Sequence, residues 1–375
     1  MGPMTLSEDA RVAPRRGNAV TAPPLADVAC CREIPEACGR IEPSAEPQLR
    51  ICQVLDGRFL IREAVGRSGM ATAYHAEDMF RGRRDVAVKV PLLRVESDSA
   101  FLARFLHDEE IGLKLSHPFL LRFYPTDRKR CRPYAVTEFL RGCTLDRLRR
   151  GSSRLPEADS LRIVSLICEA LGYMHGQGII HRDLKPTNIM ICRDQTLRVM
   201  NFELASPPGG SRGMLAKLTP VLGTPEYMAP EQVEKGRIDE RTDIYGLGAI
   251  LYELLTGSVP FQDANVWKSA SQRTTGDPIA PRVLNPALST QAEEIVLHAL
   301  QRMPADRYPS MAAFRADLSA RSSVQVTGYC NRLEPPRWRL SLQATPVLAG
   351  LLLGLGAILL LVIVFLVLSV RLAAR

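Results

Sequence analysis

The sequence predicts an α+β fold followed by one C-terminal transmembrane helix. Segments rich in β-branched residues, at 86–90 and 134–140, lie in the first half of the 375-residue chain, and such residues favour strands. Most of the longer segments with helical spacing come later, and residues 347–370 contain no charged side chain. Strands followed by helices are typical of an α+β fold, whereas an uncharged run of this length is typical of a membrane span.

The composition is that of a large folded domain with a moderate positive charge. Hydrophobic residues make up 46% of the chain, and the formal net charge is +8. The basic residues occur in short clusters, such as Arg81, Arg83 and Arg84, which we interpret as solvated faces. The alternative is attraction to acidic substrates or to an anionic membrane. No basic stripe is interleaved with aromatic residues, so nucleic acid is not an expected partner.

Residues 1–50 predict a disordered, Pro-rich N-terminal tail. Seven prolines interrupt this segment, and it shows neither helical nor strand periodicity. It contains no apolar stretch of the kind found in signal peptides. We expect the folded domain to begin near residue 55 and to extend to residue 320.

Residues 65–76 contain a turn of small residues between two strand-like segments. Val65, Gly66 and Gly69 belong to this stretch, together with Ser68 and Ala71. Backbone N–H groups in such a turn could bind the phosphates of a nucleotide. A plain β-hairpin is the alternative.

A buried lysine is predicted in the next strand. Lys89 lies within the apolar run 86–90, so we expect a buried strand with one cation facing a cleft. A buried ammonium group needs a carboxylate partner. The following segment, 100–115, has helical spacing and is expected to supply it.

Residues 181–188 bring three polar groups of different chemistry into one short loop. Asp183, Lys185 and Asn188 lie between the apolar pair 179–180 and the strand-like run 189–191, which predicts a loop held at both ends. Phosphoryl transfer requires this combination: a carboxylate that accepts a hydroxyl proton, a cation for the phosphate and an oxygen ligand for magnesium.

The loop at 181–188, with the sequence HRDLKPTN, resembles the catalytic loop of protein kinases. The resemblance covers residues 55–320 and is to bacterial membrane-linked Ser/Thr kinases. It implies the two-lobed protein kinase fold, with a small β-rich N-terminal lobe and a large helical C-terminal lobe. It also implies that Asp183 is the catalytic base, that Lys185 meets the γ-phosphate of ATP, and that Asn188 binds Mg²⁺, or alternatively Mn²⁺.

The same resemblance implies an ATP site. The residues implied for it are Val65, Gly66, Gly69, Ala87, Lys89, Thr137, Glu138 and Leu140. Thr137 would lie beside the adenine, and the backbone of 138–140 would form the hinge between the lobes; a buried edge strand is the alternative for this segment. Lys89 would act in catalysis through an ion pair with Asp108, and Glu109 is the alternative partner.

The metal-binding motif departs from the family. Residues 201–203 are Asn-Phe-Glu where protein kinases have Asp-Phe-Gly. Asn201 would offer a neutral oxygen to a metal that prefers anionic ligands. The expected loss of rate is on the order of a thousandfold. Glu203 is the alternative source of the missing carboxylate.

The segment GTPEYMAPE at 223–231 resembles the substrate-docking segment of protein kinases. The resemblance implies that Thr224 touches the base and that Thr219, in the preceding loop, is a candidate phosphorylation site. Glu231 would pair with Arg307, and Asp243 would hold the backbone of the catalytic loop from within the helix at 241–256. Both of these roles are structural.

Residues 347–370 predict a single-pass membrane anchor, preceded by a linker at 321–346 and followed by a short tail at 371–375. Its 24 residues would span roughly 36 Å as a helix, more than the hydrocarbon core of a bilayer. Gly350 and Gly354 form a GxxxG pattern that predicts homodimerisation of this helix, and an accidental pattern is the alternative. The nine cysteines form no Cys-x-x-Cys pair, which favours a reducing compartment, so we expect the large domain in the cytoplasm.

Two functions remain in competition at this point. The first is a membrane-anchored Ser/Thr protein kinase of reduced or conditional activity that phosphorylates protein hydroxyls. The second is a pseudokinase that binds nucleotide or partners without transfer, which Asn201, Glu203, Ser68 and Ala71 favour. A small-molecule phosphotransferase of related fold is disfavoured by Arg182 and by the complete docking segment.

Overall fold

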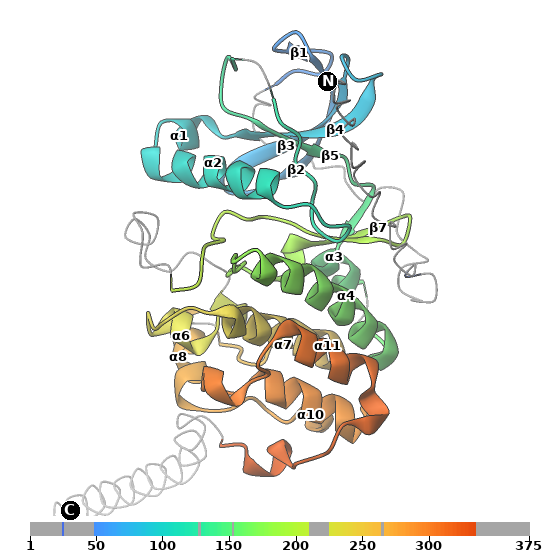
Figure 1. The fold of residues 1–375 in the computed structure, drawn as a ribbon, viewed down its shortest axis with the longest axis vertical. Coiled ribbons are helices and arrows are strands. Elements are labelled where there is room, and N and C mark those ends of the chain that lie inside the picture. Colours follow the sequence, from blue (N-terminus) through green and yellow to red (C-terminus); the bar gives the residue numbers. More distant parts are fainter. Residues whose placement is uncertain are drawn as a thin grey trace, which may run out of the picture.

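The computed structural model describes Leu25 and residues 49–126, 129–151, 154–209, 225–263 and 266–334, with only the backbone described for 225 and 266–270. These residues form a small lobe built around a β-sheet and a larger helical lobe, stacked along the long axis of the molecule (Figure 1). The predicted α+β class and its two-lobed arrangement are therefore confirmed.

The sheet of the small lobe has five antiparallel strands in sequential order. Burial alternates along the third strand, so that one face packs inward while the other stays accessible, as a period of two requires. The inward side chains form a compact apolar cluster that includes Phe59, Ile61 and Val88. The strands are β1 (Val54–Leu55), β2 (Phe59–Arg67), β3 (Ala71–Asp78), β4 (Arg84–Pro91) and β5 (Ala135–Glu138).

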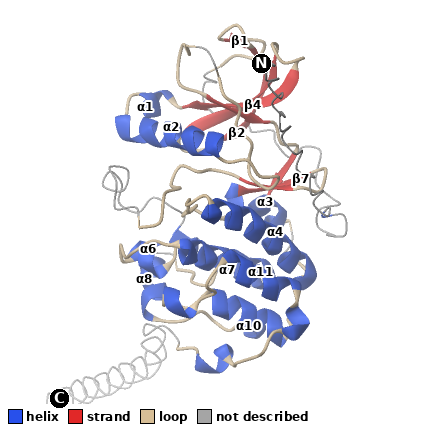
Figure 2. Cartoon of the chain, viewed as in Figure 1, coloured by secondary structure: helices blue, strands red, loops and turns tan. Residues whose placement is uncertain are grey.

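Two helices, α1 (Leu93–Glu96) and α2 (Ser99–Lys114), connect β4 to the rest of the small lobe. The carboxylate of Asp98 caps α2 by accepting hydrogen bonds from the N–H groups of Ala100 and Phe101, at 2.9 and 3.3 Å. This confirms the helix predicted at 100–115. Figure 2 shows α2 lying beside the sheet, at the left of the small lobe and above the large lobe in this view.

A second, three-stranded sheet begins the large lobe, where β6 (Gly142–Thr144), β7 (Ile189–Cys192) and β8 (Leu197–Val199) pair in sequential order. The helices follow, and the helix predicted at 241–256 is confirmed to within one residue at each end. The helices are α3 (Leu145–Arg150), α4 (Glu157–Gly176), α6 (Pro230–Val233), α7 (Glu240–Thr256), α8 (Val266–Thr275), α9 (Pro281–Leu284), α10 (Thr290–Ala299) and α11 (Met311–Ser319). Short 3₁₀ turns complete them: η3 (Pro186–Asn188), η4 (Pro225–Tyr227), η5 (Pro304–Asp306), η6 (Arg321–Ser323) and η7 (Tyr329–Arg332).

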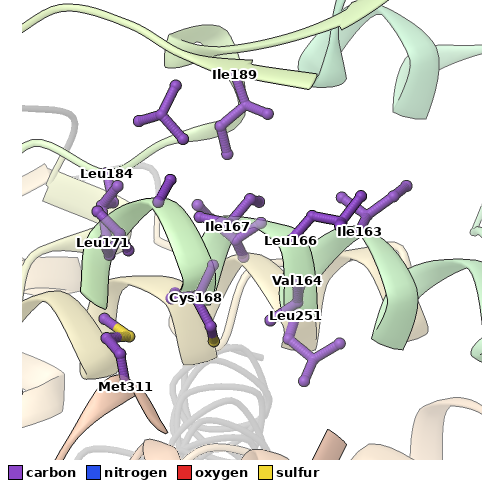
Figure 3. Close-up of a cluster of buried hydrophobic side chains, with 14 of the residues drawn as sticks. Ile163, Val164, Leu166, Ile167, Cys168, Leu171, Leu184, Ile189, Leu251 and Met311 are labelled. Carbon is purple, nitrogen blue, oxygen red and sulfur yellow. The ribbon is translucent and has the colours of Figure 1, made fainter. Parts of the chain in front are cut away.

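Helix α4 lies at the centre of the large lobe. Figure 3 shows its side chains between Ile189 on one side and Leu251 and Met311 on the other. Nearly all of these side chains are fully buried. Because α4 and the loop residue Leu184 share this core, packing of the helices fixes the loop that follows α4.

Three residues of the predicted tail and linker are hydrogen-bonded to the folded domain. Leu25, within the predicted tail, is fully buried, and its N–H group donates to the carbonyl of Gln195 at 2.9 Å. In the predicted linker, the N–H group of Thr327 donates to Glu294 at 2.7 Å, and that of Glu334 donates to Asp277 at 2.9 Å. These contacts attach both segments to the large lobe at the residues named.

In the part of the chain that the structure describes, no helix combines the length and apolar character needed to cross a membrane. The predicted span at 347–370 and the tail at 371–375 lie outside the described residues.

Helix α2 packs closely against the ring of Phe123 at Gly112. A Cβ atom added at Gly112 would lie 2.3 Å from Cδ2 of Phe123, a distance that non-bonded atoms cannot adopt. We therefore expect Gly112→Ala to lower the free energy of unfolding by about 1–3 kcal/mol through overpacking, although alanine favours a helix. Urea unfolding followed by circular dichroism measures this change.

Gly172→Ala is the matched control, since Gly172 also lies within a helix but a Cβ atom there would meet its nearest neighbour at 3.7 Å. This variant should be stabilised by up to about 1 kcal/mol. Equal stabilisation of both variants would contradict the assigned packing of Phe123.

Candidate active site

The lysine of β4 contacts two carboxylates. The ammonium group of Lys89 donates to Oδ2 of Asp108 at 2.9 Å and to Oε1 of Glu203 at 3.0 Å. Glu109, the alternative partner, instead forms an ion pair with Arg130 at 2.6 Å. Burial lowers the pKa of Lys89, but the charges of Asp108 and Glu203 outweigh burial and raise that pKa above its usual value. Lys89 is therefore held in its charged form.

Asp108 also contacts the backbone of the Asn201–Glu203 turn. Its other oxygen, Oδ1, accepts a hydrogen bond from the N–H group of Phe202 at 2.6 Å. The ring of Phe202 is fully buried, with its centroid 6.1 Å from that of Phe123 and 5.9 Å from that of His181. One carboxylate thus connects α2, β4 and the turn after β8.

The backbone of the catalytic loop is held by a buried aspartate of α7. The carboxylate of Asp243 accepts from the N–H groups of His181 at 2.9 Å and Arg182 at 2.8 Å, and it lies 2.8 Å from the ring of His175. Burial raises the pKa of Asp243, but these hydrogen bonds and the nearby histidines together lower it. Arg182 has a φ of 67°, a left-handed conformation that costs on the order of 1 kcal/mol. The bonds to Asp243 offset that cost, which agrees with the structural role predicted for this residue.

The three polar groups of the loop converge on Asp183. The ammonium group of Lys185 lies 2.9 Å from Oδ2 of Asp183, and the amide nitrogen of Asn188 donates to the same oxygen at 3.0 Å. The amide nitrogen of Asn201 also donates to Oδ2 of Asp183, at 3.3 Å. The structure therefore brings Asp183, Lys185, Asn188 and Asn201 together, as the sequence predicts.

This group is a poor fit for a divalent cation. Asp183 is the one carboxylate in it, and that carboxylate is already paired with Lys185, while both carboxamides direct their NH₂ groups toward it. Among the described residues, no cluster of three or more His, Cys, Asp or Glu side chains could hold a metal. Hard divalent cations prefer several anionic oxygens, and this group provides one carboxylate that is already neutralised by Lys185.

The turn between β2 and β3 binds its own backbone. The hydroxyl of Ser68 accepts hydrogen bonds from the N–H groups of Met70 at 3.2 Å and Ala71 at 3.0 Å. These N–H groups belong to the turn that the sequence predicts as a phosphate cradle, around Gly66 and the exposed Gly69. The hydroxyl of Ser68 therefore binds two of the N–H groups that the sequence predicts as donors to nucleotide phosphate.

The strand that leads to the large lobe lies next to Lys89. In the pairing of β4 with β5, Ala87 faces Thr137 and Lys89 faces Ala135. Thr137 is buried, and its hydroxyl donates to the carbonyl of Glu138 at 3.2 Å. The carboxylate of Glu138 accepts from Arg198 of β8 at 2.9 Å, which links the two lobes at this point.

A buried ion pair closes the large lobe. Arg307 donates two parallel hydrogen bonds, each 2.8 Å long, to the two carboxylate oxygens of Glu231. Glu231 also accepts from the hydroxyl of Thr242 at 2.8 Å. The predicted pairing of Glu231 with Arg307 is thus present. Thr219 and Thr224 lie outside the described residues.

Two contacts of the site were not predicted from the sequence. The sequence indicates Glu203 only as an alternative carboxylate for the metal, but its side chain binds Lys89 instead. The sequence indicates Ser68 only as a small residue of the turn, but its hydroxyl accepts two backbone hydrogen bonds. The signals available in the sequence were Glu203 and Ser68, which stand at two positions where protein kinases have glycine. Neither residue type identifies its partner by itself.

Comparison with known proteins agrees with this geometry. The protein kinase domain family matches residues 59–318. The chain is 36% identical over 278 residues to a "probable serine/threonine-protein kinase" of Streptomyces coelicolor, covering 73% of this chain and 41% of that protein. It is 35% identical over 268 residues to the serine/threonine-protein kinase PknB of Mycobacterium tuberculosis, covering 70% of this chain and 43% of that protein.

The chain therefore belongs to the protein kinase domain family. As a family, protein kinases use ATP and divalent metal ions and act on protein substrates. The chain matches less than half the length of these two curated relatives.

Removal of one member of the buried Glu231–Arg307 pair should be strongly destabilising. Glu231→Gln would leave the Arg307 guanidinium, whose side chain is fully buried, without a negative partner. We expect the free energy of unfolding to fall by about 3–5 kcal/mol, the usual result of removing one member of a buried pair. Urea unfolding measures the loss.

Glu110→Gln is the control for this variant, because Glu110 forms an exposed ion pair with Lys114 on α2. Its loss should cost less than about 0.5 kcal/mol. A similar small effect in both variants would show that the buried pair is not a stabilising contact.

Proposed function

We propose that this chain is a membrane-anchored serine/threonine protein kinase whose activity is reduced or conditional. The convergence of Lys185 and Asn188 on the carboxylate of Asp183 carries this proposal. A loop with this geometry would be retained by an enzyme that transfers phosphate to a hydroxyl group. The relatives named above are serine/threonine-protein kinases, which supports the same substrate class.

In the proposed reaction, a protein hydroxyl hydrogen-bonds to the carboxylate of Asp183, which accepts its proton as the oxygen attacks the γ-phosphorus of ATP. The bond between the γ-phosphorus and the bridging oxygen breaks, and ADP leaves with the electron pair. Lys185, 2.9 Å from Asp183, supplies positive charge for the transferred group. Lys89 would bind the phosphates that remain on the nucleotide.

The proposed kinase domain comprises residues 55–320, with an N-terminal tail before it and the linker at 321–346 after it. We propose that residues 347–370 anchor the chain in the cell membrane, with the kinase domain in the cytoplasm. The absence of charge over 24 residues supports the anchor, and Gly350 and Gly354 support pairing of two such helices.

The second candidate function is a pseudokinase scaffold. Asn201 contributes no negative charge to the metal site, and Glu203 and Ser68 occupy groups that would bind phosphate. A scaffold would bind nucleotide or a protein partner without transferring phosphate. The two candidates differ in one observable, the transfer of the γ-phosphate.

Transfer from γ-labelled ATP in Mg²⁺ or Mn²⁺ distinguishes them. We expect weak label in the native chain, a loss of at least about a hundredfold in Asp183→Asn because the base is removed, and a clear gain in Asn201→Asp because a negative charge is restored. Label in neither the native chain nor Asn201→Asp, with either metal, would eliminate the kinase function and leave the scaffold.

The anchor is tested by fractionation. The full chain should remain in the membrane pellet after alkaline carbonate extraction, because burying an apolar helix of this length is effectively irreversible. A chain ending at residue 338 should be soluble. Release of the full chain by carbonate would be inconsistent with a membrane-spanning helix.

A further inference from the structure

The groups of this site that would meet nucleotide phosphates are already bound by side chains of the same chain. The N–H groups of Met70 and Ala71 donate to the hydroxyl of Ser68. The ammonium group of Lys89 donates to both Asp108 and Glu203. An incoming phosphate therefore has to replace internal partners.

The two carboxylates on Lys89 give their cluster an excess of negative charge. One ammonium group faces two carboxylates at 2.9 and 3.0 Å, so the three side chains carry a net charge of −1. Triphosphates carry several negative charges, and like charges within a few ångströms repel strongly at a partly buried site. The uncharged part of a nucleotide, the adenosine, experiences no such repulsion.

Of the two carboxylates that bind Lys89, Glu203 is held by fewer contacts than Asp108 and is more easily displaced. The side chain of Asp108 is only 3% exposed, and it is held by the N–H group of Phe202 as well as by Lys89. The side chain of Glu203 is 15% exposed, and it projects from the turn at 201–203 rather than from a helix. Its charge also acts on Arg104 of α2, where it opposes the lowering of the pKa of Arg104 by burial.

We propose that the Glu203 carboxylate competes with nucleotide phosphate for Lys89, so that the site gains little affinity from the phosphates of ATP until Glu203 is displaced. This inference rests on the proposed nucleotide-binding function of the site. Glu203 is then a residue that determines ligand selectivity. Its carboxylate weakens the binding of ATP but leaves the binding of adenosine unchanged, compared with a site that lacks it.

The alternative role for Glu203, as a metal ligand, makes the opposite prediction. A metal ligand would improve ATP binding when Mg²⁺ is present, and its removal would weaken binding. Glu203 binds Lys89, whereas Asn188 and Asn201 gather around Asp183. Among the described residues, no group of three or more His, Cys, Asp or Glu side chains could hold a metal ion, which favours competition.

The test compares adenosine, ADP and ATP by isothermal titration calorimetry on the full chain in detergent micelles, in EDTA and then with Mg²⁺. In Glu203→Gln, a near-isosteric change, ATP in EDTA should bind about tenfold more tightly than to the native chain, whereas adenosine should bind equally to both. Glu203→Ala should show the same gain for ATP. Glu110→Gln, which removes an exposed carboxylate of α2, should change neither affinity.

Three results would overturn the inference: weaker ATP binding in the Glu203 variants with Mg²⁺, an equal gain for adenosine and ATP, or no binding of any nucleotide by the native chain and both variants. The phosphotransfer assay tests the proposed kinase function separately from this inference about Glu203. An ATP-selective gain without any transfer would support the inference and reject the kinase function. Phosphate transfer by the native chain, together with equal ATP affinity in the native chain and the Glu203 variants, would support the kinase function and reject the inference.

Discussion

The charged side chain of Lys89 is the constraint on which the site depends. A partly buried ammonium group must have a negative partner, and here the partners come from α2 and from the turn after β8. Because Asp108 also accepts the N–H group of Phe202, the small lobe, its helix and the turn of the large lobe take their relative positions from one cluster. In the proposed site, displacement of Glu203 from this cluster controls whether nucleotide phosphate can bind Lys89.

The large lobe depends on two other buried carboxylates. Asp243 holds the catalytic loop in a conformation that includes a left-handed arginine, and Glu231 binds Arg307 through two hydrogen bonds. Asp243 binds the backbone of the loop whose side chains converge on Asp183, and Glu231 binds Thr242, the neighbour of Asp243 in α7. The lobe therefore presents a preorganised loop, whereas the groups expected to bind phosphate are bound internally. That contrast explains why a kinase of conditional activity and a scaffold are both consistent with the same chain.

Much of the fold could be predicted because it depends on local patterns. The helices α2 and α7 follow from apolar spacing in the sequence. The pairing of Glu231 with Arg307, and that of Lys89 with Asp108 rather than with Glu109, follow from the resemblance to protein kinases. The burial of Leu25 against the large lobe could not be predicted, since an isolated leucine among prolines carries no periodic signal.

The sequence by itself determined the family, the loop chemistry around Asp183 and the replacement of a metal-binding aspartate by Asn201. These are matters of residue identity at fixed spacing. Only the tertiary structure decided that Glu203 also binds Lys89 and that the hydroxyl of Ser68 binds the N–H groups of its own turn. Lys89 and Glu203 are separated by 114 residues, so their contact depends on how the two lobes pack, and no local pattern encodes it.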